Sequence, residues 1–171
     1  MTAATQPSAA PNASRSAAPD QPETPLLQVR RLHPEALLPR RHSAHAAGLD
    51  LAACLPAGAS VTLAPGDIAL IPCGFAMAIP IGFEAQVRPR SGLASRHGVS
   101  MPNTPGTIDS DYRGEVKVPL INLGREPFTV EHAMRIAQMV IARVALPEVA
   151  EVDSLDDTER GSGGFGSTGV A

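Results

Sequence analysis

The sequence predicts an all-β protein, and three observations support that fold class. Short runs of Val, Ile and Leu are separated by turn residues, 17 prolines and 15 glycines punctuate the chain, and long amphipathic helices are absent from the pattern. A length of 171 residues suits a single domain. The formal charge of -3 gives no reason to expect a nucleic-acid surface, and no apolar segment is long enough to cross a membrane.

The expected strands follow one another along the chain. They cover residues 26–32, 60–63, 67–71, 75–79, 83–88, 115–122 and 127–131. A last segment, residues 135–146, also fits a helical face, but its β-branched content favours a strand.

The two ends of the chain differ in composition from this domain, which we place at residues 26–155. Residues 1–25 are rich in Ala, Pro, Ser and Thr, so we expect them to be disordered. They lack the apolar run of a signal peptide and the arginines of a transit peptide, which favours a cytoplasmic location. Residues 156–171 form a Gly-rich arm that we expect to be mobile until a ligand binds it.

The arm also contains groups that suit a nucleotide. Arg160, Ser167, Thr168 and the glycine amides could surround a polyphosphate. Phe165 could stack on a base, a contact that contributes ~1–3 kcal/mol. The alternative is a flexible tail of low complexity, which would not require Phe165.

A candidate site lies in residues 103–115, which combine turn formers, carboxylates and the only tyrosine. Ile108 followed by the alternating Val116, Val118 and Leu120 predicts two strands that fold back as a hairpin, with Asp109 beside a backbone edge. A carboxylate there could deprotonate water, and neighbouring main-chain groups could bind a small planar ligand. The alternative is a surface hairpin in which Asp109 only favours the turn.

A second candidate site lies in residues 88–98. Ser91 follows Arg90 and opens a stretch compatible with one helical turn, whose backbone amides attract anions. The alternative makes Ser91 an ordinary N-cap and leaves the arginines in solvent.

Two patterns are compatible with metal binding, but the sequence favours neither as a metal site. Cys54 and Cys73 form no CxxC arrangement, so we expect free thiols. His42 and His45 have a suitable spacing, but arginines lie alongside and no neighbouring acid completes a ligand set, so we expect solvated loop histidines.

Five segments, in order, resemble the motifs of the trimeric-type dUTPases, the deoxyuridine triphosphate nucleotidohydrolases. They are residues 47–51, 89–94, 103–114, 135–139 and 160–169. Leu49 departs from the family's frequent tyrosine, and Met134 replaces a common acidic residue before Arg135, which weakens an expected support for that arginine. The resemblance implies an all-β distorted jelly-roll barrel of the β-clip type, assembled as a homotrimer.

The resemblance also implies a reaction. Asp109 would be the general base that activates water for attack on the α-phosphorus of dUTP, leaving dUMP and pyrophosphate. This hydrolysis would limit uracil incorporation into DNA and supply dUMP for dTTP synthesis. A Mg²⁺ ion would be held mainly by substrate phosphates and waters, without a direct protein ligand that we can name.

The resemblance assigns substrate contacts in four groups, and it implies that the second and fourth motifs, the third motif, and the fifth motif come from different subunits of the trimer. Phosphate contacts are Arg90, Ser91, Gly92 and Gln138; uracil contacts are Asn103 and main-chain groups of Thr107, Ile108 and Lys117; the sugar packs on Tyr112; and the arm contributes Arg160, Phe165, Gly166, Ser167 and Thr168. Asp50 and Arg135 are expected to support these groups without touching substrate.

Two other functions remain as alternatives. The chain also resembles the related dCTP deaminases, which share the fold and a similar Gly-x-Ile-Asp core. That resemblance implies a catalytic glutamate ten residues after the Asp, where this chain has Pro119. The third hypothesis is a nucleotide-binding regulator without catalysis. It would require a damaged catalytic set, whereas Asp109, Tyr112 and Gln138 are all present.

Overall fold

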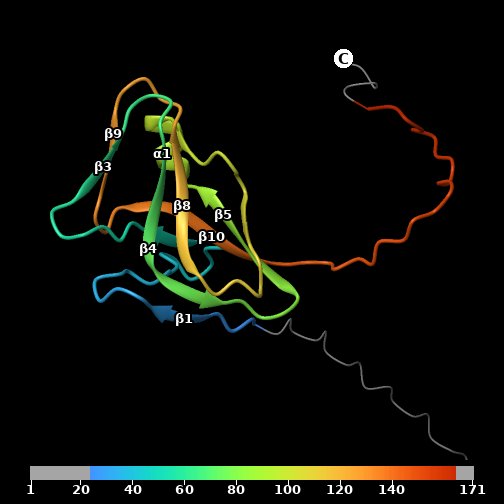
Figure 1. Ribbon diagram of the computed structural model, residues 1–171, viewed down its shortest axis with the longest axis horizontal. Coiled ribbons are helices and arrows are strands. Elements are labelled where there is room, and N and C mark those ends of the chain that lie inside the picture. The colour runs from blue at the N-terminus through green and yellow to red at the C-terminus, as the bar shows by residue number, and fades with distance from the viewer. Residues whose placement is uncertain (1–23, 165–171) are drawn as a thin grey trace, which may run out of the picture.

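A computed structural model describes residues 24–164 as a β-protein with one short helix, which confirms the predicted fold class (Figure 1). The strands are β1 (Gln28–Arg31), β2 (Leu49–Ala52), β3 (Ser60–Leu63), β4 (Ile68–Ala78), β5 (Phe83–Pro89), β6 (Val99–Ser100), β7 (Gly106–Ile108), β8 (Glu115–Asn122), β9 (Phe128–Glu131) and β10 (Arg135–Arg143). The helix α1 covers Ser91–His97. No helix within residues 24–164 has the length and apolar character needed to cross a bilayer.

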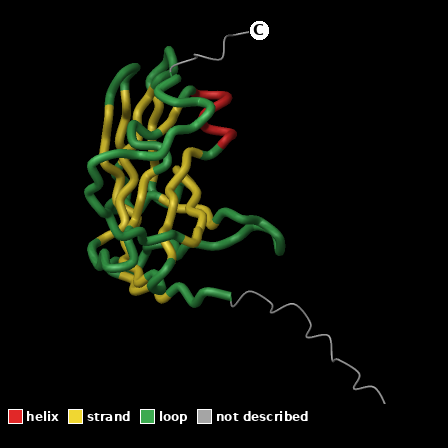
Figure 2. The backbone as a smooth tube through the Cα atoms, turned by 90° about the vertical axis from the view of Figure 1, so that its right-hand side faces the viewer, coloured by secondary structure: helices red, strands yellow, loops and turns green. Residues whose placement is uncertain are grey.

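The strands form two four-stranded sheets and one two-stranded sheet. One sheet has the order β1-β4-β8-β6, the second has the order β2-β10-β5-β7, and the small sheet pairs β3 with β9. Figure 2 shows the strands filling the body of the molecule, with α1 at one end. Because β10 lies between β2 and β5, it brings together three of the five motif segments.

The core lies between the sheets and is filled by Leu, Ile, Val, Met and one fully buried phenylalanine, Phe75. On β8, alternate residues Val116, Val118 and Leu120 are buried, as a two-residue period requires. Cys54 and Cys73 are buried free thiols, as expected from their spacing. The strand assignment for residues 135–146 is also confirmed, because β10 pairs with two neighbours over Arg135–Arg143.

The strands predicted at residues 67–71 and 75–79 are one strand, β4, so that division is wrong. β8 pairs with the first part of β4 and β1 with its end, and the register shifts between Pro72 and Ala76. Gly74 lies in this irregularity with φ +71°, and a Cβ there would lie 2.6 Å from Cys54 Sγ. The turn residues therefore mark a bulge inside a strand rather than its end.

The predicted hairpin is also wrong. β7 pairs with β5, whereas β8 pairs with β4 and β6, so the two strands belong to different sheets. The loop between them crosses from one sheet to the other, because β8 buries its apolar residues next to the long strand β4. The prediction also missed β2 and the two-residue β6, which are short and lack clear alternation.

The helix begins differently from the N-cap alternative. Arg90 is the N-cap residue, without a side-chain cap hydrogen bond, and Ser91 is the first helical residue. The helix has seven residues and ends at Gly98, whose φ of +68° allows the left-handed closing turn.

Beyond β10, the chain leaves the body in a wide arc in Figure 1. Val149 in this segment is 97% exposed.

Candidate active site

The site residues predicted within residues 103–117 line one pocket of about 350 Å³. Asn103, Thr107, Ile108, Asp109, Tyr112 and Lys117 all contribute to it, together with Leu70, Glu115, Val116 and Pro119. Although β7 and β8 are not paired, the loop between them keeps both strands beside the same hollow. The structure therefore brings together every residue that the sequence assigned to base and sugar recognition, with the candidate general base.

Asp109 is an exposed residue at the end of β7. It lines both this pocket and an adjacent hollow that includes Ser110, Asp111 and Glu84. The loop after it is closed by its own hydrogen bonds, because the Tyr112 amide donates to the Asp109 carbonyl at 3.2 Å. Arg113 also donates to the Ser110 and Tyr112 carbonyls at 2.6 and 2.8 Å. This bonding holds Asp109 at a rim open to water, as a base that activates water requires.

Tyr112 is 45% exposed, and its hydroxyl donates to the Glu115 carbonyl at 3.0 Å. A Cβ on Gly114 would lie 2.6 Å from the Tyr112 ring carbon Cζ. The glycine therefore leaves the space that the folded-back ring occupies. In this position Tyr112 lines the pocket.

Glu115 links the pocket to the bulge of β4. One carboxylate oxygen accepts the Gly74 amide at 3.0 Å, and the other lies 3.6 Å from Lys117 Nζ. Desolvation by burial, followed by the Glu115 charge, raises the pKa of the Cys73 thiol to about 12. Sequence reasoning did not assign Glu115 to the site, because its partner Gly74 is 41 residues away.

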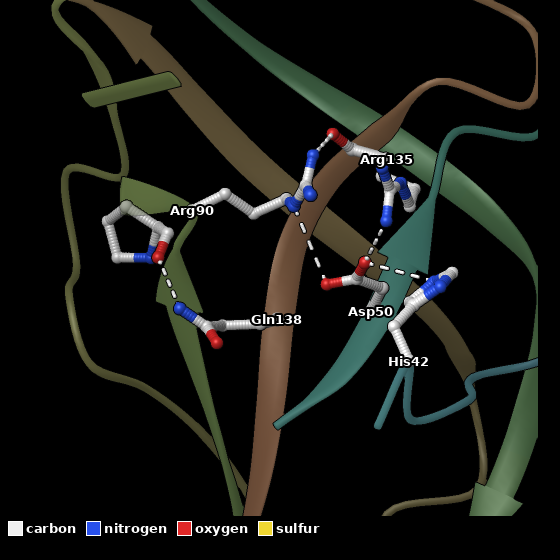
Figure 3. A network of polar contacts seen from close by, with 6 residues as sticks. His42, Asp50, Arg90, Arg135 and Gln138 are labelled. Atoms are coloured by element: carbon white, nitrogen blue, oxygen red, sulfur yellow. Dashed lines mark hydrogen bonds and ion pairs between the residues drawn. The ribbon is translucent and has the colours of Figure 1, made fainter. Parts of the chain in front are cut away.

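The second group of predicted residues forms a charged cluster, shown in Figure 3. The Asp50 carboxylate on β2 lies 2.9 Å from Arg135 Nη1 and 3.5 Å from Arg90 Nε. Arg90 Nη1 also donates to the Arg135 carbonyl at 3.2 Å. Because the Asp50 side chain is only 18% exposed, it holds both guanidinium groups from a partly buried position.

The Met134 departure is compensated within this cluster. Asp50 supplies the acidic partner of Arg135, and Met134 packs against the core while its carbonyl accepts the Ala53 amide at 2.8 Å. Leu49 likewise packs against the core as a partly buried residue. Neither departure removes a contact of the arginine cluster.

Gln138 lies on β10 next to this cluster and donates to the Pro89 carbonyl at 3.0 Å (Figure 3). A Cβ on Gly48 would lie 2.7 Å from Gln138 Oε1, which explains the glycine in the first motif. Ser91 and Gly92 open α1 directly after Arg90, and the first amides of a helix lack intrahelical acceptors. The donors expected to bind phosphate thus lie on neighbouring strands and one helix start.

The arginine cluster and Gln138 do not line the pocket around Asp109 within the described chain. Arg160 contacts its own arm, because its Nε donates to the Gly163 carbonyl at 2.8 Å. Phe165, Gly166, Ser167 and Thr168 lie outside the described residues. One chain therefore brings together two separate halves of the predicted site.

His42 and His45 are exposed loop residues, as predicted. His42 is in addition part of the arginine cluster, because its Nε2 lies 3.2 Å from the Asp50 carboxylate. The sequence showed no neighbouring acid because Asp50 returns beside His42 only when the Asp50 amide bonds to the Arg40 carbonyl. No group of three side chains suited to hold a metal gathers within residues 24–164.

Comparisons with known proteins identify the family of this chain. A model of the dUTPase family matches residues 35–169. The deoxyuridine 5'-triphosphate nucleotidohydrolase of Beijerinckia indica is 57% identical over 150 residues, covering 86% of this chain and 94% of that protein. Its counterpart from Rhizobium meliloti is 58% identical over 149 residues, covering 86% and 93%.

A solved structure gives the same result at lower identity. The Staphylococcus bacteriophage 80alpha dUTPase with dUpNHpp superposes with a TM-score of 0.76 at 28% identity, covering 85% of this chain and 99% of that one. The fold is thus that of an all-β nucleotide hydrolase. The chain belongs to the dUTPase family. It is an enzyme, a dUTP diphosphatase.

Proposed function

We propose that the protein hydrolyses dUTP to dUMP and pyrophosphate, with Asp109 as the general base that activates water for attack on the α-phosphorus. The observation that supports this most is the pocket in which Asp109 lies beside the five predicted base and sugar contacts. A general base contributes only ~10²–10⁴-fold, whereas enzyme rate enhancements begin near ~10⁶. Positioning and charge neutralisation must therefore supply the rest.

The base and sugar are proposed to bind in the pocket around Asp109. Asn103 and main-chain groups of Thr107, Ile108 and Lys117 would hydrogen-bond the uracil edge, and Tyr112 would pack against the deoxyribose. The volume of about 350 Å³ suits a nucleoside and supports this assignment. Cytosine would place an amino group against donors and leave polar groups unpaired, which disfavours dCTP.

The triphosphate is proposed to bind Arg90, Ser91, Gly92 and Gln138. Arg90 is restrained at two nitrogens by Asp50 and the Arg135 carbonyl, which supports a preorganised guanidinium. Asp50 and Arg135 would then act as positioning residues. Their contacts fix Arg90 without requiring that either touches substrate.

Mg²⁺ is proposed as the ion that accompanies the triphosphate. Residues 24–164 build no cage of three or more ligating side chains, a donor set that fits an ion carried by phosphate oxygens and waters. When bound, the ion would neutralise phosphate charge. The chain's own residues would still bind the base, orient the phosphates and hold the attacking water.

We also propose that three chains share the work in a homotrimer. The Asp109 pocket and the arginine cluster are separate within one chain, which supports completion of each site by a neighbour. Arg160, Phe165, Gly166, Ser167 and Thr168, in an arm that begins at residue 156, would close the site of another subunit. The 97% exposure of Val149 in the preceding segment supports an arm able to reach away from its own domain.

In the cell, this reaction would limit uracil incorporation into DNA and supply dUMP for dTTP synthesis. A cytoplasmic location fits a free nucleotide substrate, and no nucleic-acid or membrane partner is proposed. The catalytic domain would cover residues 26–155, with an extension at 1–25.

The test is an assay of purified protein with Mg²⁺ and, separately, dUTP, dCTP, dTTP and UTP. Pyrophosphate from dUTP alone is the expected result. Ammonia from dCTP would favour the deaminase alternative. That outcome is not expected, because this chain has Pro119, which lines the pocket, at the position of the glutamate that the resemblance assigns to the deaminases. Binding of dUTP without any product would favour a regulator.

A further inference from the structure

His42 lies in the arginine cluster although no motif of the sequence includes it. Its Nε2 is 3.2 Å from Asp50 Oδ2, the same oxygen that lies 2.9 Å from Arg135 Nη1. Arg90 Nε lies 3.5 Å from the other oxygen, Oδ1. Figure 3 shows the imidazole and the two guanidinium groups directed at the one carboxylate. Asp50 thus connects His42 to the arginine proposed to bind phosphate.

The loop that carries His42 is folded onto β2 rather than hanging free. The Asp50 amide donates to the Arg40 carbonyl at 2.9 Å, which brings the loop start beside β2. The Arg41 guanidinium donates to the Ala46 carbonyl at 2.9 Å, and the Ala46 amide donates to the Ser43 carbonyl at 3.2 Å. These bonds on both sides of His42 hold its ring over Asp50.

The charge of this cluster depends on the state of His42. Asp50, Arg90 and Arg135 together carry one net positive charge, and a protonated imidazole would make it two. Nε2 must carry a hydrogen in either state, because a nitrogen lone pair at 3.2 Å would repel the carboxylate oxygen.

We propose that His42 is a positioning residue for triphosphate binding. When protonated, it takes up part of the Asp50 charge and raises the positive potential at Arg90. This inference rests on the proposed function, because it requires that Arg90 binds the phosphates. The effect is modest because the His42 side chain is 41% exposed, so water screens its charge. It acts on substrate binding and not on the chemical step at Asp109.

The test compares KM and kcat for dUTP at about pH 5.5 and about pH 8.5 with saturating Mg²⁺. The variants are His42→Gln, which keeps a neutral donor, and His42→Lys, which keeps a positive charge at both values. His45→Gln is the matched control, because His45 is exposed on the same loop and outside the cluster. Titration of dUTP itself cancels in each ratio of variant to wild type.

We expect the His42→Gln KM to be about threefold above wild type at the acidic value and equal to it at the alkaline value, with kcat unchanged. The His42→Lys KM should equal wild type at the acidic value and be about threefold below wild type at the alkaline value. Equal KM ratios for His42→Gln at both pH values would overturn the inference while leaving the proposed function intact. Absence of dUTP hydrolysis by the wild-type enzyme would instead overturn the proposed function, and the inference with it.

Discussion

The pocket around Asp109 and the cluster around Asp50 are built in opposite ways. The pocket residues assigned to base and sugar lie within residues 103–117, and the loop between β7 and β8 holds them through its own hydrogen bonds. The cluster gathers Asp50, Arg90 and Arg135 from separate parts of the chain through ion pairs. The assigned pocket residues are therefore close along the chain, whereas the cluster forms only after β10 has paired with β2 and β5.

The two regions also differ in how firmly their main charged residue is held, and this difference matches the roles proposed for Asp109 and Arg90. Asp109 is exposed and carries no restraining ion pair in the described chain, as suits a group that must accept a proton from water. Arg90 is held at two nitrogens, as suits a group that must wait in place for an anion. A change at Asp109 should therefore affect turnover, and changes in the cluster should affect substrate binding.

The largest effect is expected for Asp109→Asn. Turnover should fall by ~10²–10⁴-fold while dUTP binding is retained, because the amide keeps the shape but cannot accept the proton. Single-turnover hydrolysis and calorimetric binding of dUTP measure the two quantities. Asp111→Asn is the matched control, an exposed carboxylate two residues away. Substantial activity in Asp109→Asn would remove this residue as the base.

Arg90→Gln should act on the other half of the site. Loss of a charged hydrogen-bond donor costs roughly 1.5–3 kcal/mol, so KM should rise by about 10–100-fold with a smaller change in kcat. Steady-state kinetics check this, with Arg88→Gln as the control, an exposed arginine two residues earlier on β5. A change confined to kcat would contradict the division between the two regions.

Glu115→Ala tests the hydrogen bond between the Glu115 carboxylate and the Gly74 amide, which links the pocket to β4. It removes the acceptor of the buried Gly74 amide, so the free energy of unfolding should fall by ~1–3 kcal/mol. Urea unfolding at fixed protein concentration measures the change. Lys117→Ala removes only an exposed ion pair and should cost less than ~1 kcal/mol. Equal losses in the two variants would show that the Gly74 contact is unimportant.

The smallest effect concerns Cys73, a buried residue of β4 next to Gly74. Burial, followed by the charge of Glu115, raises the pKa of its thiol from 9.0 to about 12. Between pH 9 and about pH 12 the thiol is ionised in the unfolded state and protonated in the folded state, so unfolding releases a proton. The free energy of unfolding should therefore fall as pH rises above about 9. The slope approaches ~1.4 kcal/mol per pH unit at most. Urea midpoints between about pH 8 and about pH 10 should decline less in Cys73→Ala than in wild type; parallel declines would contradict the assignment.

Most of the fold could be predicted from alternating apolar residues, but strand partners could not. Val116, Val118 and Leu120 identified β8 correctly, yet nothing local showed that it pairs with β4 instead of β7. The break predicted between the strands at residues 67–71 and 75–79 lies at Gly74, but it is a bulge, because β4 continues to pair with β8 and β1 beyond it. Pairing depends on which apolar faces meet in the core, and that information is not local.

The sequence by itself identified most of the residues that line the pocket, because Asn103 through Lys117 are close along the chain, although β7 and β8 pair with different strands. It also determined the all-β class and the resemblance to dUTPases. Only the tertiary structure decided that Asp50 holds Arg90 and Arg135, that His42 joins them, and that Glu115 supports Gly74. The physical reason is that ion pairs and hydrogen bonds act over a few ångströms, and strand pairing alone brings such distant residues within that range.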